Sequence, residues 1–115
     1  MCARLVAGLP DRVDGGERRD TDPASRLTAA WGDPPLVLRC GVERPPGLKP
    51  TSEILEVEAV DWFLVESDAG YSFTTVGRVA NVELTVPAEV DRSAASAPLV
   101  DLAPAILRVV SEVAR

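Results

Sequence analysis

The sequence contains no histidine, and this absence removes several kinds of chemistry at once. Histidine is the usual general base, the commonest zinc ligand and the central member of Ser–His–Asp triads. Catalysis would have to use carboxylates, Tyr71, Lys49 or a free thiol. A carboxylate pair such as Asp61 with Glu83 could serve hydrolysis in the manner of a glycosidase. No phosphate loop or dinucleotide motif is present, so we expect no cofactor.

Basic residues are outnumbered: Lys and Arg total 12 against 18 Asp and Glu, which gives a net charge of −6. Affinity for a phosphate backbone depends on clustered Lys and Arg, so we predict no nucleic-acid partner. Between Lys49 and Arg78 there is no basic residue at all. The acidic residues of this stretch are Glu53, Glu56, Glu58, Asp61, Glu66 and Asp68.

This acidic stretch has two interpretations. It fits a solvated sheet face or edge, where charge discourages aggregation between strands. It also fits a docking surface for a basic partner, or a weak cation site. The carboxylates do not follow the spacing of a calcium loop, so no metal site is predicted.

A long apolar run is also missing. None approaches the roughly 18 residues that a bilayer span requires, and no signal peptide is recognisable. Met1 lies directly against the first predicted helix, which fits a start that replaces a removed N-terminal segment.

What is present suits one globular domain over residues 1–115. This length is common for a single domain and buries roughly two thirds of the unfolded surface, enough for one hydrophobic core. The composition, 46% hydrophobic and 26% charged, is ordinary for a folded protein.

Two helices are predicted in the N-terminal third. Residues 2–9 place apolar side chains at helical spacing, and Pro10 ends the segment. Residues 22–31 begin with Asp22-Pro23, where Asp can cap and Pro fits the first helical position. Gly32 then suits a left-handed residue after the helix end.

The middle of the chain predicts antiparallel strands. Residues 36–42 form a largely buried strand, with Gly41 as a bulge or point of close approach. Residues 54–66 change their alternation phase near Glu58-Ala59, which indicates a hairpin turn. The other predicted strands cover residues 17–19 (an edge strand), 71–76 and 82–86, and the proline-rich residues 44–50 form a loop.

A C-terminal helix completes the pattern. Its predicted apolar face consists of Leu99, Leu102, Ile106, Val110 and Val113. Pro104 conflicts with an early start, so we expect a loose first turn and a regular helix from about residue 101. The order of elements predicts an α+β two-layer sandwich, with a mainly antiparallel sheet covered on one face by the N-terminal and C-terminal helices.

The two cysteines, Cys2 and Cys40, lie 38 positions apart and outside any C-x-x-C pair. Zinc binding and thioredoxin-type chemistry are therefore poorly supported. Two buried thiols of a cytosolic protein and one disulfide from the first helix to the strand at 36–42 both fit the residues.

Several blocks of the sequence resemble domain-of-unknown-function family 3515 of actinobacteria (DUF3515). The most specific block is Trp31–Val42. The others, in the same order as in the family, are residues 2–5 with 9–10, 60–62, 74–78 and 82–87.

The resemblance implies a domain outside the cytoplasmic membrane, held by an N-terminal hydrophobic segment or lipid that this sequence does not show. It favours the disulfide between Cys2 and Cys40, because oxidising compartments let such bonds persist. The family often has a glycine before Val60, where this chain has Glu58-Ala59, and this difference argues against a tight two-residue hairpin. No activity is implied.

Trp31, Trp62, Arg39 and Arg78 are the candidate binding residues. Trp and Arg are over-represented at binding hot spots, and Arg can stack on an indole or grip a carboxylate. The alternative is that both tryptophans belong to the core and both arginines pair with nearby acids at strand ends.

The sequence thus leaves the function open among three hypotheses. The first, which we favour, is a non-enzymatic, envelope-associated module that binds another envelope protein or a small ligand, through an exposed patch with Trp31 or Trp62. The second is a histidine-free hydrolase or transferase that acts on cell-wall material through paired carboxylates. The third is a structural domain whose partner lies on the same chain.

Overall fold

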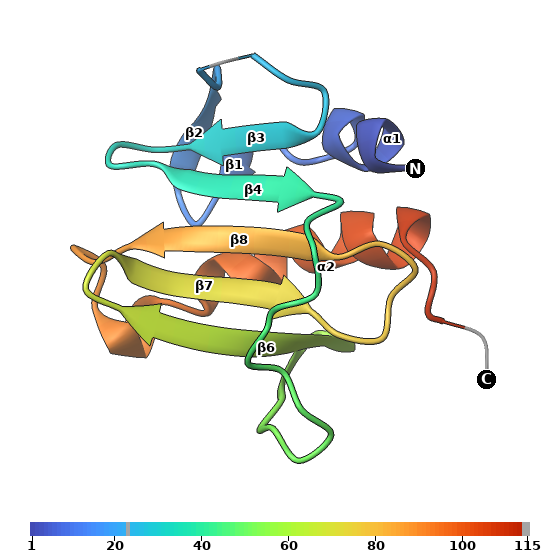
Figure 1. Cartoon of the computed structure of the whole chain (residues 1–115). Helices are drawn as coiled ribbons and strands as arrows, with labels where there is room; N and C mark the ends of the chain where they lie inside the picture. The colour runs from blue at the N-terminus through green and yellow to red at the C-terminus, as the bar shows by residue number, and fades with distance from the viewer. Residues whose placement is uncertain (23, 114–115) are drawn as a thin grey trace.

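The computed structural model describes residues 1–22 and 24–113, and its main element is an antiparallel sheet of eight strands (Figure 1). The strands follow the order β1-β2-β3-β4-β8-β7-β6-β5. Their bounds are β1 (Arg12–Val13), β2 (Gly16–Arg19), β3 (Thr28–Trp31), β4 (Leu36–Cys40), β5 (Leu55–Val57), β6 (Val60–Ser67), β7 (Gly70–Thr75) and β8 (Val82–Pro87). The helices are α1 (Cys2–Ala7), the short 3₁₀ helix η1 (Arg92–Ala94) and α2 (Ala97–Val109). The predicted α+β class is confirmed.

The helix predicted over residues 22–31 is wrong. Its second half is β3, which pairs with β2 on one side and with β4 on the other. Two neighbouring strands satisfy the backbone groups of β3 and bury Ala29 and Trp31, and this non-local gain overrides the local capping signals. Gly32, with φ of 77°, lies in the β3–β4 turn. Pro23, at the start of the predicted helix, lies outside the described residues.

The hairpin of β5 and β6 is confirmed, and it is tight. Val57 pairs with Val60, so the turn consists of Glu58 and Ala59 alone. Both residues have positive φ, 50° and 69°, as a turn matching the twist of the strands requires. The absence of glycine, which argued against a tight two-residue hairpin, therefore does not prevent one.

Helix α2 lies behind the sheet in Figure 1 and buries Leu99, Leu102 and Ile106. It begins at Ala97, earlier than predicted, with proline in the first turn, where it is tolerated, and Pro104 in the interior. Val113, predicted on the apolar face of this helix, follows its end and is 53% exposed. In the described part of the chain, neither helix is long and apolar enough to cross a membrane.

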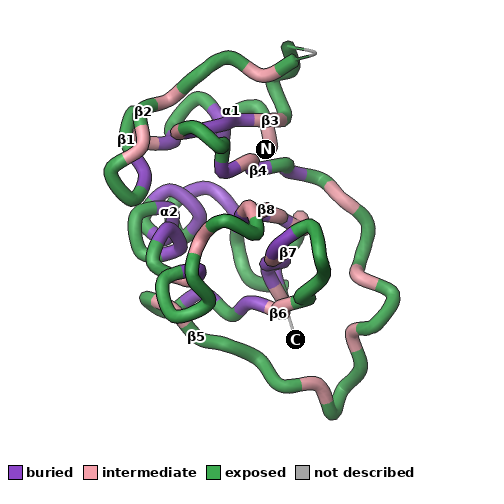
Figure 2. Tube along the Cα trace, turned by 90° about the vertical axis from the view of Figure 1, so that its left-hand side faces the viewer, coloured by how far each residue is buried: buried purple, intermediate pink, exposed green. Residues whose placement is uncertain are grey.

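We call the sheet face that packs against α2 the inner face and the opposite one the outer face. Along β8 the side chains alternate, and Val82, Leu84 and Val86 are buried on the inner face. Figure 2 shows α2 on one side of the sheet and the exposed connection from β4 to β5 on the other. Helix α1 adds Leu5 and Val6 to the core. That α1 and α2 together form one helical layer stays a prediction.

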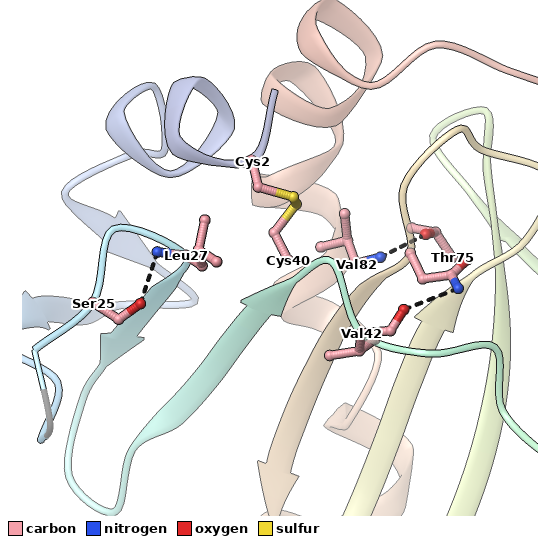
Figure 3. Close-up of a disulfide and its surroundings, with 8 residues drawn as sticks. Cys2, Ser25, Leu27, Cys40, Val42, Thr75 and Val82 are labelled. Atoms are coloured by element: carbon pink, nitrogen blue, oxygen red, sulfur yellow. Dashed lines mark hydrogen bonds between the residues drawn. A yellow bond between two sulfur atoms is a disulfide. The ribbon is translucent and has the colours of Figure 1, made fainter.

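The predicted disulfide is confirmed: Cys2 and Cys40 are bonded, with their Cα atoms 5.5 Å apart (Figure 3). It joins the start of α1 to the last residue of β4. Next to it, the Asn81 side-chain amide donates to the Val42 carbonyl at 3.1 Å, and the Val82 amide donates to the Thr75 hydroxyl at 2.9 Å. The N-terminal segment is thus fixed covalently to a central strand.

Candidate functional site

The two tryptophans among the candidate binding residues are core residues. Trp31 and Trp62 are both 0% exposed. The indole N–H of Trp31 donates to the Pro10 carbonyl at 3.0 Å, and the Arg18 guanidinium lies 5.9 Å from its ring centre. The binding hypothesis expected an exposed patch that contains Trp31 or Trp62. Because both side chains are buried, neither can form part of such a patch.

The two candidate arginines lie apart and have different surroundings. Arg39 is exposed on the outer face and pairs with Glu83 of the neighbouring β8. Arg78 is buried, and its guanidinium donates to the Val110 carbonyl at 3.0 Å and to the Ala59 carbonyl at 3.3 Å. The four candidates do not gather on one surface. A binding role for Arg39 stays a prediction.

The carboxylates proposed for hydrolysis lie on the outer face of two different strands. Asp61 belongs to β6 and Glu83 to β8, with β7 between them. Glu83 already accepts hydrogen bonds from Arg39, so the arrangement does not present two facing carboxyl groups to a substrate. The hydrolase hypothesis gains no support from this pair and stays a prediction.

The acidic stretch divides into three groups in the fold. Glu56 and Asp61 face each other across β5 and β6, and Glu58 and Asp68 lie in turns. Glu53 and Glu66 line a cavity together with Arg92. Among the described residues no three His, Cys, Asp or Glu side chains are close enough to hold a metal ion.

That cavity is one end of a groove formed where the inner face of the sheet meets the segment before α2. A first cavity of about 510 Å³ is lined by Leu55, Leu64, Tyr71 and Phe73, with Arg92 and the segment to Ser96 on the other side. The second, of about 520 Å³, shares Leu55, Leu64 and Arg92 with the first and adds Ile54 and the two glutamates. We call the two together the β6 groove.

The groove has an apolar floor and a charged rim. Ile54 and Leu55 are each 40% exposed, so the apolar floor of the groove is open to solvent. At the rim, the Arg92 guanidinium lies 2.8 Å from the Glu66 carboxylate. Since this arginine is already paired, Glu53 leaves the rim with a net negative charge.

Beside the groove, the backbone edge of β6 is open. β5 has three residues and pairs only with Val60–Trp62, whereas β6 has eight. Antiparallel residues alternate in the side to which their N–H and C=O point. The Asp61 carbonyl accepts from the amide of Val76 after β7, so the backbone groups of the odd-numbered residues of β6 point toward β7. The backbone N–H and C=O groups of Leu64 and Glu66 therefore point to the opposite side, past the end of β5. Among the described residues no hydrogen bond to their backbone groups is found.

Sequence reasoning missed this site, although it contained one signal. The strand that precedes the turn at Glu58-Ala59 has to be short, because Pro50 and Ser52 lie only a few residues before the turn. The strand that follows runs on to the next turn at Asp68. Two hairpin arms of unequal length leave part of the longer arm unpaired.

These features define a small, disulfide-linked α+β domain with an apolar groove beside an open sheet edge. The chain matches the family described as "Protein of unknown function (DUF3515)" over residues 1–114, and it therefore belongs to this family. The resemblance seen in the sequence is confirmed. No curated protein and no solved structure matches the chain.

Proposed function

We propose that this domain is a non-enzymatic interaction module of the cell envelope, which binds another envelope component in the β6 groove. The observation that carries the proposal is the groove itself, where Leu55 and Leu64 offer apolar surface beside unpaired backbone groups. Exposed apolar surface with a polar rim is typical of binding sites. The binding residues are thus those of the groove and not the buried tryptophans.

We place the module outside the cytoplasmic membrane, held there by an anchor that precedes the domain. The Cys2–Cys40 disulfide supports this location, because such bonds persist in oxidising compartments and are rare in the cytosol. The check is the intact mass of protein from its native host after alkylation under denaturing conditions, with and without prior reduction. Thiols that are labelled without reduction would contradict the location.

A photo-crosslinker in the groove tests the binding proposal. We replace Leu55 by p-benzoylphenylalanine in the full-length protein in its own membranes, and expect a discrete adduct with one envelope component. A matched position is Leu107 on α2, which is 45% exposed and lies outside the groove, and which should give no such adduct.

Two variants make this test specific. Leu64→Asp puts a charge on the groove floor and should abolish the adduct, whereas Val65→Asp changes the neighbouring residue, which is 45% exposed, and should keep it. The component identified by mass must then form the same adduct in purified form. Adducts that persist in the Leu64→Asp variant would refute the groove as the binding site.

A further inference from the structure

We infer that the partner of the β6 groove is an extended polypeptide segment with a basic side chain, which adds to the open edge of β6 as a further strand. This inference rests on the proposed function and deepens it, because it names the chemical class of the partner. Three independent properties of the site lead to it: its unpaired backbone, its side-chain alternation and its charge.

The backbone of β6 offers one N–H and one C=O at each of Leu64 and Glu66. These groups point past the end of β5, where the described residues provide no partner. An extended peptide is the ligand that satisfies such groups in sequence, because its own N–H and C=O groups repeat with the same period. A compact small molecule would leave part of this row unpaired.

The side chains of an added strand would alternate between the two faces of the sheet. Those on the inner face would lie beside Leu64 and Glu66 and enter the groove. One such side chain meets the apolar floor of Leu55 and Phe73, and the one two positions away meets the carboxylate of Glu66. The site therefore favours a peptide with an apolar and a basic residue two positions apart.

Charge decides between the candidate occupants. Glu53 and Glu66 line the groove, Arg92 is engaged by Glu66, and residues 50–77 contain no basic residue. A basic segment complements this field, whereas a second copy of the same edge would bring two more carboxylates into the groove. Like charges brought together destabilise a strand pair, so the acidic residues select against self-association.

The probe for the test is the peptide acetyl-Thr-Val-Thr-Lys-Thr-Val-Thr-amide, titrated into the isotope-labelled 115-residue chain and followed by NMR. Its sequence pattern reads the same in both directions, so no strand direction has to be assumed. We expect shifts concentrated at Leu64–Ser67 and in the groove. The amide exchange of Leu64 and Glu66 should slow at least tenfold at saturation.

Two N-methylated forms of the probe separate strand addition from simple groove binding. One carries the methyl groups on Lys and both Val residues, the other on the two Thr residues that flank Lys. In a paired strand only one set of amides faces β6, so one form should bind at least tenfold more weakly and the other should bind normally. If both forms bind as well as the parent, the strand-addition inference is refuted while the groove remains a binding site.

Charge is tested by matched variants on one strand. Glu66→Gln should weaken binding of the Lys probe several-fold, whereas Asp61→Asn on the outer face should leave it unchanged. A probe with Glu in place of Lys should bind at least tenfold more weakly than the parent.

Three results overturn the inference. They are equal affinity for the Glu and Lys probes, no binding of any probe at millimolar concentration, and concentration-dependent shifts at Leu64 and Glu66 without peptide, which would identify a second copy as the occupant. In each case the crosslinking experiment decides separately whether the groove binds an envelope component, so the two proposals can fail independently.

Discussion

The buried guanidinium of Arg78 should hold two distant parts of the fold together. Its side chain is only 5% exposed. It donates to the carbonyl of Val110, after the end of α2, and to the carbonyl of Ala59, in the β5–β6 turn. The Glu112 carboxylate lies 3.7 Å away, but that side chain is 78% exposed. The two carbonyl bonds, and not the ion pair, should therefore account for the contribution of Arg78 to stability.

Replacement of Arg78 by Met keeps the aliphatic stem and removes both donors. A hydrogen bond from a charged donor contributes roughly 1.5–3 kcal/mol, and a buried carbonyl left alone costs a comparable amount. Relief of the desolvation of the charge offsets part of this loss. Because the contact with Ala59 is the longer one, at 3.3 Å, we expect a net loss of about 3 kcal/mol in the free energy of unfolding.

Urea unfolding and native-state hydrogen exchange measure this loss. The Arg78→Met variant should unfold at lower urea with an unchanged slope, and the amides at the end of α2 and in the β5–β6 hairpin should lose protection together. The matched control, Glu112→Gln, should cost less than about 1 kcal/mol, as exposed pairs do. A loss below about 1 kcal/mol for Arg78→Met, or an equal loss for both variants, would show that the reasoning is wrong.

Three further changes test the packing and the turns. Replacing both Cys2 and Cys40 by Ala opens a loop of 38 residues and should lower the free energy of unfolding by roughly 4 kcal/mol in the chain-entropy model, and an unchanged urea midpoint would contradict this. Replacing Glu58-Ala59 by Asn-Gly should raise stability by about 1 kcal/mol, because both positions have positive φ, and a lower melting temperature would argue against it. Gly70→Ala should cost about 3 kcal/mol or more, since φ is +132° and an added Cβ would collide with the backbone of β8; near-native stability in urea would exclude that collision.

The sequence predicted the elements whose signals are local or strongly periodic. The turn at Glu58-Ala59 was visible as a change of alternation phase, and β8 as alternate buried residues over 82–86. The disulfide followed from the family resemblance and not from the spacing of the cysteines. The helix predicted over residues 22–31 failed because its evidence was capping chemistry at the two ends, without a periodic apolar face between them. Pairing with β2 and β4, which no local signal reveals, decided that segment.

The candidate site was harder to predict for a different physical reason. Trp31 and Trp62 were considered because of their residue type, yet large aromatic side chains stabilise a small core most strongly, and both are buried there. The groove exists because β5 is too short to pair with the second half of β6. Arg92, before α2, lines the other side of the groove. Such an absence of partners arises from the whole fold, so single residues carry little sign of it.

The fold separates the disulfide from the proposed binding groove. The disulfide joins α1 to β4, and in the sheet order both β8 and β7 lie between β4 and β6. In Figure 1 the N-terminus lies at one end of the strands, whereas β6 runs toward the other end, where the following turn leads into β7. The open half of β6 therefore lies toward the end of the strands opposite to the N-terminus. A segment of another envelope protein could then reach the groove without displacing α1, which the disulfide holds in place.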